Sequence, residues 1–172
     1  RFHELLRAQV TGLIPEDTIS PLEPVTRLDD VVAGSAGAIR EGLARTVIIK
    51  LNGGLGTGMG IRGPKSALPV RDGLTFLDII ARQVLALRRR HGVDTPLLLM
   101  NSFRTREQSL EILERYDDLP VDELPLDFLQ SMEPKLRADD LSPVEWPDDP
   151  ELEWCPPGHG DLYVALYTSG LL

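Results

Sequence analysis

A glycine-rich segment in the first half of the chain carries the residues best suited to chemistry. Six glycines fall within the eleven residues from Gly53 to Gly63, and Pro64, Lys65 and Ser66 follow. Ordering so many glycines costs chain entropy, so a purely structural turn is a poor explanation. A backbone without Cβ atoms can bring successive N–H groups against a ligand, and a neighbouring lysine adds a positive charge. The segment therefore predicts a loop that binds phosphate groups.

Two known phosphate-binding motifs fit this segment poorly. The dinucleotide fingerprint G-x-G-x-x-G matches from Gly58 onward, but Pro64 follows it and no helix is expected before Thr75. A P-loop needs lysine directly after its last glycine, and Pro64 displaces Lys65 and Ser66 by one position. The remaining interpretation is a longer phosphate loop of the nucleotidyltransferase kind, which ends at Lys65.

Alternating strands and helices are expected to position this loop. Thr46–Leu51 is β-branched and almost continuously apolar, which predicts a strand buried on both faces, and Pro96–Met100 and Leu126–Leu129 predict two more. Helices are expected from about Phe76 to His91 and after Thr105. This order predicts an α/β fold, with a Rossmann-like mixed or parallel sheet flanked by helices.

Local signals mark the ends of these two helices. Thr75 and Asp78 predict a capping box for the first helix, and Gly92 predicts its end. Arg88–Arg90 in its last turn are expected to complement the helix dipole. Thr105 is expected to open the second helix with another capping box. The expected apolar positions are Phe76, Ile80, Val84 and Leu87 in the first helix and Leu110, Leu113 and Tyr116 in the second.

The two ends of the chain lack the alternating strand and helix pattern of its centre. Residues 2–13 predict a short amphipathic helix with Phe2, Leu5, Leu6 and Val10 on one stripe, and three prolines predict an extended segment over 14–26. Residues 34–43 are ambiguous, with a short helix as one option. Five prolines predict irregular structure over 131–160, and residues 161–172 predict a helix capped by Asp161.

Composition and charge exclude several classes of protein. The 172 residues include 18 Lys and Arg, 27 Asp and Glu and one Cys, with a formal net charge of −9. No stretch approaches the roughly 20 apolar residues of a membrane span. A negative net charge disfavours nucleic-acid binding, and one Cys cannot form an internal disulfide. We therefore expect a cytoplasmic protein whose partners are neither membranes nor nucleic acids.

The negative charge is unevenly distributed along the chain. Residues 1–86 carry 10 basic and 9 acidic side chains, whereas residues 87–172 carry 8 basic and 18 acidic ones. The glycine-rich segment thus lies in a nearly neutral half. There, backbone N–H groups and one placed cation can hold an anion without help from the overall field.

Three motifs, in order along the chain, resemble the eukaryotic-type UDP-glucose pyrophosphorylase (UTP–glucose-1-phosphate uridylyltransferase) family. They are Leu51–Ser66, Leu99–Phe103 and Trp154–Tyr163, the last containing Pro-Pro-Gly-His-Gly-Asp. The resemblance runs from Thr46 to Leu172 and, more weakly, over the N-terminal helix. The chain departs from the family at Gly58, where the family usually has Ser. Around Gln130 it departs again, with Leu129 for Asn and Lys135 for Arg.

The resemblance implies transfer of a uridylyl group from UTP to glucose 1-phosphate, with release of pyrophosphate and with Mg²⁺ as cofactor. Such chemistry needs positioning and charge neutralisation more than a protein nucleophile. On this basis Leu51 and Asn52 would frame the base, and Gly53 and Gly54 would present N–H groups to the nucleotide. Lys65 would place its charge on the triphosphate as the catalytic cation.

The later motifs would supply the other contacts. The amide of Gln130 could satisfy both the N–H and the carbonyl of uracil and so reject cytosine. Gly158 would let the base or ribose lie against bare backbone, and His159 would donate to the sugar phosphate or the α-phosphate. Met100 at a strand end could face the base or belong to the core.

Two alternatives stay open at this stage. One is a pyrophosphorylase for another sugar 1-phosphate of the N-acetylglucosamine type, although Asn52 favours glucose because those relatives usually carry Ala there. The other is a non-catalytic nucleotide-binding module. The resemblance further implies that residues 1–45 form a helical and extended arm and that 46–172 are the N-terminal part of a truncated catalytic domain. The Mg²⁺ ligands and the sugar site are then expected beyond Leu172.

Overall fold

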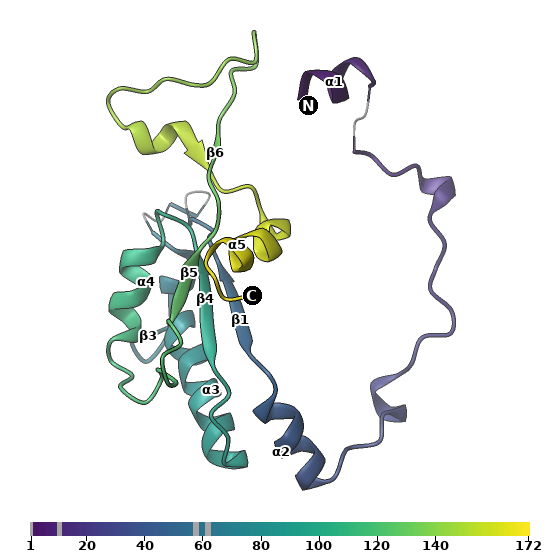
Figure 1. Ribbon diagram of the computed structural model, residues 1–172, viewed down its shortest axis with the longest axis vertical. Coiled ribbons are helices and arrows are strands. Elements are labelled where there is room, and N and C mark those ends of the chain that lie inside the picture. The colour runs from purple at the N-terminus through teal and green to yellow at the C-terminus, as the bar shows by residue number, and fades with distance from the viewer. Residues whose placement is uncertain (1, 10–11, 57–58, 61–62) are drawn as a thin grey trace. The chain divides into compact units, whose positions relative to one another are not determined.

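The computed structural model describes residues 2–9, 12–56, 59–60 and 63–172, and divides the chain into two compact units, Arg1–Gly34 and Ser35–Leu172 (Figure 1). The first unit holds helix α1 (Phe2–Arg7) and two short 3₁₀ turns, joined by extended and exposed backbone. The predicted helix and extended segment are both present. The helix is shorter than expected, and Val10 lies outside the described residues.

The second unit is built on a three-stranded parallel sheet, as predicted. Strand β4 (Leu97–Asn101) lies between β1 (Ile48–Asn52) and β5 (Asp127–Leu129). The register pairs Asn52 with Asn101 and Asn101 with Leu129. All three strands therefore end at the same edge of the sheet.

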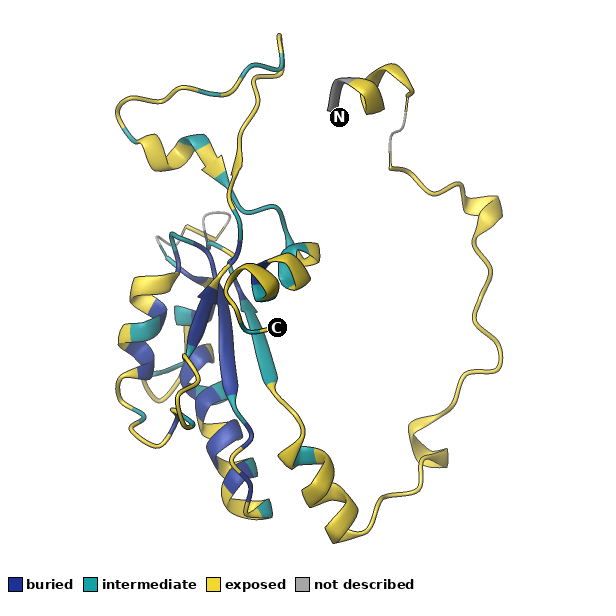
Figure 2. Cartoon of the chain, viewed as in Figure 1, coloured by how far each residue is buried: buried dark blue, intermediate teal, exposed yellow. Residues whose placement is uncertain are grey.

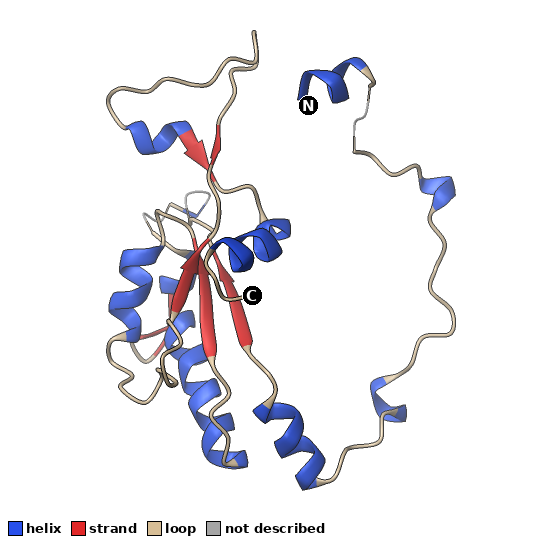
Figure 3. Ribbon diagram, viewed as in Figure 1, coloured by secondary structure: helices blue, strands red, loops and turns tan. Residues whose placement is uncertain are grey.

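Helices cover both faces of this sheet. Helices α3 (Phe76–His91) and α4 (Arg106–Leu113) pack on the face that carries Leu97 and Leu99. Helix α5 (Leu162–Thr168) packs on the opposite face, against Leu98, Met100 and Phe128. Helix α2 (Ala36–Ala44) precedes β1 and settles the ambiguous segment as helical (Figure 3). The predicted α/β architecture is confirmed.

Strand β1 differs from its prediction as a strand buried on both faces. Among the described residues it has one neighbouring strand, and residues 48–51 are only half-buried (Figure 2). The central strand β4 is buried along its whole length. A continuous apolar run marks a strand of a covered sheet, but it does not tell a central strand from an edge strand.

Helix α3 confirms its predicted ends and corrects its predicted face. The Thr75–Asp78 capping box forms, and Gly92 ends the helix in the left-handed region at φ 61°. Phe76, however, is 48% exposed. The buried residues of the helix are Leu77, Asp78, Ala81, Val84, Leu85 and Arg88. Val84 is buried as predicted and Ile80 packs against the core, but the centre of the buried face lies nearer Leu77, Ala81 and Leu85, because the sheet, not the caps, fixes the rotation of the helix.

Helices α4 and α5 begin without the predicted side-chain caps. The Thr105 hydroxyl accepts from the Ser102 N–H at 2.9 Å, so it stabilises the turn before α4 instead of capping the helix. The buried residues of α4 are Ser109, Ile112 and Leu113. Asp161 likewise uses its carboxylate elsewhere, to accept from the Ser131 N–H at 2.6 Å.

Short antiparallel strand pairs complete the second unit. Strand β2 (Pro69–Arg71) pairs with β3 (Leu74–Thr75), and β6 (Glu133–Pro134) pairs with β7 (Trp154–Cys155). The β6–β7 pair adds order to the stretch over 131–160 that was predicted to be irregular. No helix among the described residues is long and apolar enough to cross a membrane.

Candidate functional site

The predicted site residues gather where the three parallel strands end. Gly53 follows the last residue of β1, Gln130 follows the last residue of β5, and Asn101 ends the strand between them. In parallel α/β sheets, ligands bind outside the carboxyl ends of the strands. The sheet therefore places Gly53 and Gln130 at the edge where a nucleotide would be expected.

The described parts of the glycine loop form two limbs that run antiparallel. The Lys65 N–H donates to the Gly54 carbonyl at 3.0 Å, and the Gly56 N–H donates to the Gly63 carbonyl at 3.0 Å. This pairing returns Lys65 to the start of the loop, where a Cβ on Gly54 would lie 3.8 Å from its Cδ. Lys65 is exposed. Gly58, with its departure from the family and the start of the dinucleotide match, lies outside the described residues.

Gln130 lies against Gly53. A Cβ atom built on Gly53 would collide with the side-chain amide of Gln130. Gln130 is buried, and its Nε2 is the one buried side-chain nitrogen or oxygen of the described residues without a hydrogen-bond partner. A buried donor without a partner is costly, so this amide would gain from a partner beyond the described residues.

Asn52 is turned away from the loop surface. Its Nδ2 donates to Asn101 Oδ1 at 2.7 Å and to Ser109 Oγ at 2.8 Å, while its Oδ1 accepts from Ser66 Oγ at 2.5 Å. The side-chain amide is therefore fully used within the protein. Contact with a base would have to come from the Asn52 backbone.

Leu51 and Met100 both point into the packed face under α5. Met100 is completely buried there, so the alternative that it faces a base is wrong and the core assignment holds. Leu51 is half-buried against the same cluster. Its neighbour Lys50 is half-buried on the opposite face, where burial lowers the pKa of its ammonium group.

The Gly158–His159 segment is tied to the residue after Gln130. Gly158 has φ 106°, which an L side chain rarely adopts, and nothing lies within 4 Å of a Cβ built there. His159 is exposed at the start of a 3₁₀ turn. The bond from the Ser131 N–H to Asp161 Oδ2 links this turn to the end of β5.

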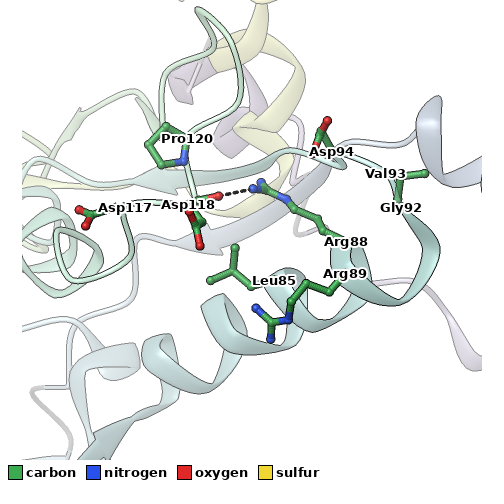
Figure 4. A pocket seen from close by; sticks show the side chains of 9 residues that line it. All are labelled: Leu85, Arg88, Arg89, Gly92, Val93, Asp94, Asp117, Asp118 and Pro120. Carbon is green, nitrogen blue, oxygen red and sulfur yellow. Dashed lines mark hydrogen bonds between the residues drawn. The ribbon is translucent and has the colours of Figure 1, made fainter.

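A different concavity lies at the opposite end of the sheet and contains none of the predicted site residues (Figure 4). It measures about 550 Å³ and surrounds the end of α3. Arg88 there is buried, and its guanidinium donates to the carbonyls of Thr95, Asp118 and Leu119 at 2.9, 2.7 and 2.9 Å. Arg88 lies in the last turn of α3 as expected, and its bonds to the loop carbonyls also hold it inside the protein.

The sequence motifs predicted no individual role for several polar residues near the loop. They are Ser66, Asn101, Arg106, Ser109 and Asp127, which hydrogen bonds join into one group through Asn52. A usable signal was present, since Asn52 and Asn101 each end an apolar strand with an amide. Their pairing could not be derived from either motif alone.

The described residues do not fit a metal site. They contain no group of three or more His, Cys, Asp or Glu side chains that could hold an ion. The single Cys155 donates its thiol to the Glu133 carbonyl at 3.6 Å. Among the described residues of the glycine loop, Lys65 supplies the positive charge.

Comparisons with known proteins point in one direction. The profile of the family described as UTP–glucose-1-phosphate uridylyltransferase matches residues 1–172. A probable UTP–glucose-1-phosphate uridylyltransferase of Schizosaccharomyces pombe is 42% identical over 83% of this chain and 28% of its own length. The UTP–glucose-1-phosphate uridylyltransferase of Solanum tuberosum is 40% identical over 93% of this chain and 31% of its own length. The chain thus spans just under a third of these relatives.

Solved structures agree with the sequence relatives. A Trypanosoma brucei protein titled UDP-glucose phosphorylase superposes with a TM-score of 0.83 at 42% identity, over 98% of this chain and 36% of that one. A mutant UDP-glucose pyrophosphorylase of Leishmania major, solved in complex with UDP-glucose, gives a TM-score of 0.82 at 40% identity, over 98% and 35%. The chain therefore belongs to the UTP–glucose-1-phosphate uridylyltransferase family.

Proposed function

We propose that the protein containing this chain transfers the uridylyl group of UTP to glucose 1-phosphate, forming UDP-glucose and releasing pyrophosphate. Family membership supports this activity. One structural observation supports it for this chain: the buried Nε2 of Gln130, beside Gly53, has no hydrogen-bond partner among the described residues. The described chain would form the part of the enzyme that binds the nucleotide.

The Gln130 amide has the right chemistry to select uracil. Uracil presents an N–H beside a carbonyl, and one carboxamide can accept from the first and donate to the second. Cytosine presents no N–H at that ring nitrogen, so the amide orientation that pairs with uracil would set its oxygen against a lone pair of cytosine. A free Nε2 donor at a strand end is what such a contact requires.

The glycine loop and Lys65 would act on the phosphates. Gly53 and Gly54 would present backbone N–H groups to the nucleotide, with the backbone of Leu51 and Asn52 beside the base. The Lys65 ammonium would offset the charge that builds up as the sugar phosphate approaches the α-phosphorus. The hydrogen bond from the Lys65 N–H to the Gly54 carbonyl supports this placement, because it holds the lysine beside the first limb of the loop.

The third motif would complete the contacts. The unusual backbone of Gly158 leaves an open surface on which the ribose or base could lie. His159 would donate from its exposed position to the sugar phosphate or the α-phosphate.

Mg²⁺ enters the proposal only as the cation that would accompany UTP, because the described residues offer no cluster to hold it. The single cysteine supports a cytoplasmic setting.

The test is an assay of the full-length protein with UTP, glucose 1-phosphate and Mg²⁺. We expect pyrophosphate and UDP-glucose in equal amounts. Parallel reactions would replace glucose 1-phosphate by N-acetylglucosamine 1-phosphate, or UTP by CTP. A clear preference for the acetylated sugar would assign a different pyrophosphorylase activity, and calorimetric binding of UTP without any turnover would assign a non-catalytic module. Either result would overturn the proposal.

A further inference from the structure

A series of hydrogen-bonded, buried polar side chains joins the ends of the strands next to the glycine loop. Asn101 is fully buried, and Asn52, Ser66 and Asp127 are exposed by 3, 7 and 8%. Polar groups at such depth are tolerated when every donor and acceptor is hydrogen-bonded, and are costly otherwise. The arrangement of their bonds therefore decides what they do.

The bonds run in one direction from the loop toward β5. Ser66 Oγ donates to Asn52 Oδ1 at 2.5 Å, and Asn52 Nδ2 donates to Asn101 Oδ1 at 2.7 Å. Asn101 Nδ2 then donates to Asp127 Oδ2 at 3.1 Å. Each side-chain amide donates a hydrogen bond on one side and accepts one on the other. Neither asparagine can therefore turn over without losing bonds on both sides.

An ion pair anchors the far end of this series of hydrogen bonds. Arg106 donates to Asp127 through Nε at 2.8 Å and through Nη2 at 3.3 Å, and this hydrogen bonding raises the pKa of Arg106. Ser109 Oγ accepts the second hydrogen of Asn52 Nδ2 at 2.8 Å. Both anchors come from helix α4, so the loop is bonded through the sheet to a rigid element.

The other end of this series lies next to the residues proposed to contact the nucleotide. Ser66 follows Lys65 directly, and Asn52 precedes Gly53. The backbone carbonyl of Asn101 accepts from the Gln130 N–H at 2.9 Å. The series of bonded side chains therefore reaches all three proposed contacts. Lys65 and Gly53 are each one peptide bond away from one of its members, and Gln130 is one hydrogen bond away.

We propose that Ser66, Asn52, Asn101 and Asp127 form a positioning network that holds Lys65 and Gly53 in register with Gln130. Stability alone does not call for it, because well-packed apolar residues often replace buried polar groups at no cost. A phosphate-binding cation does call for it, since misplacement by about 1 Å can cost about 100-fold in rate. This inference rests on the proposed function for its effect on turnover, but not for its effect on the loop.

The experiment compares Ser66→Ala with the wild-type full-length protein. The variant removes only the hydroxyl that ties the Lys65 limb to Asn52. Hydrogen–deuterium exchange on peptides spanning residues 53–66, without nucleotide, should become several-fold faster because the loop limb is released. kcat should fall about tenfold, with a smaller change in KM for UTP, while the melting temperature shifts by no more than about 3 °C. Thr95→Val is the matched control, since its buried hydroxyl donates to the Leu43 carbonyl at 3.1 Å, at the other end of the sheet.

Two variants keep the test decisive. Asp127→Asn weakens the anchor at the opposite end and should accelerate exchange of the same peptides, so the outcome does not depend on the folding of one variant. Unchanged exchange in both variants would overturn the positioning network. Faster exchange with unchanged kcat would overturn its role in turnover. A wild-type protein that releases no pyrophosphate would instead refute the proposed function, while the exchange results would still decide the network.

Discussion

Gly53 and Gln130, from two different strand ends, lie so close that a single added carbon on the glycine would collide with the glutamine amide. Gln130 is buried, and its Nε2 has no partner among the described residues. The glycine thus leaves room for a polar side-chain nitrogen that the other described residues do not bind. This relationship gives the candidate site its sharpest experimental consequences.

Replacing Gly53 by Ala should reduce kcat/KM for UTP by at least about tenfold, because the new methyl group displaces the Gln130 amide. Steady-state kinetics of the full-length enzyme would measure the change. Gly42→Ala is the matched control, since a Cβ there meets nothing within 4 Å in helix α2. Normal UTP kinetics in Gly53→Ala would remove this contact from the site.

Replacing Gln130 by Leu should leave the ligand-free protein as stable as the wild type or more so. The change removes a buried unpartnered donor, whose cost is about 1–3 kcal/mol, and keeps a side chain of similar volume. Discrimination between UTP and CTP should nevertheless be lost. Urea unfolding and competition between the two nucleotides would measure both effects. A strongly destabilised variant would mean that the amide already has a partner within the protein.

Local signals predicted much of the fold because they depend on neighbouring residues only. Thr75, Asp78 and Gly92 act within one turn of helix α3, so its ends could be derived from the sequence. The rotation that buries Leu77 and exposes Phe76 could not, because it is fixed by the sheet against which the helix packs.

The site was predictable in part for the same reason. Its glycines and Lys65 stand in one continuous segment, whose composition already indicates phosphate binding. The contact between Gln130 and Gly53, and the bond between Asn52 and Asn101, join segments far apart in the sequence. Only the parallel register of the strands brings these groups together.

Replacing Lys65 by Ala should lower kcat about 100-fold and change the free energy of unfolding by no more than about 0.5 kcal/mol. Lys65 is exposed, so the folded state loses little packing, whereas the triphosphate loses a placed charge. Arg90→Ala, at an exposed position late in helix α3, serves as the matched loss of a cation. Full turnover in Lys65→Ala would remove this residue from the active site.

Replacing Arg88 by Met should cost about 3 kcal/mol in the free energy of unfolding, because three backbone carbonyls lose a charged donor. Urea unfolding would measure this value. Arg89→Met makes the same chemical change at the next position, where the side chain is exposed, and should stay within about 0.5 kcal/mol of the wild type. Equal effects of the two substitutions would contradict the structural role of Arg88.

The buried carboxylate of Asp78 should make the free energy of unfolding depend on pH in the acidic range. Burial alone would raise its pKa. Hydrogen bonds from Thr75 and Tyr116, together with the charge of Arg115, outweigh burial and hold the pKa of Asp78 below its ordinary value. Because the folded form binds a proton less readily than the unfolded chain, this stabilisation is complete above the ordinary pKa of about 3.9. It is lost as the pH falls below that value toward the folded pKa.

Asp78→Asn should therefore be less stable than the wild type by about 2 kcal/mol at pH 7, and the difference should shrink as the pH falls below about 4. Unfolding free energies measured over this pH range test the prediction. Asp72→Asn is the control, because Asp72 is exposed at φ 52°, a backbone conformation that asparagine tolerates, and its ion pair with Arg71 lies on the surface. A gap between Asp78→Asn and the wild type that stays constant down to acidic pH would show that the charge of Asp78 is not what stabilises the start of helix α3.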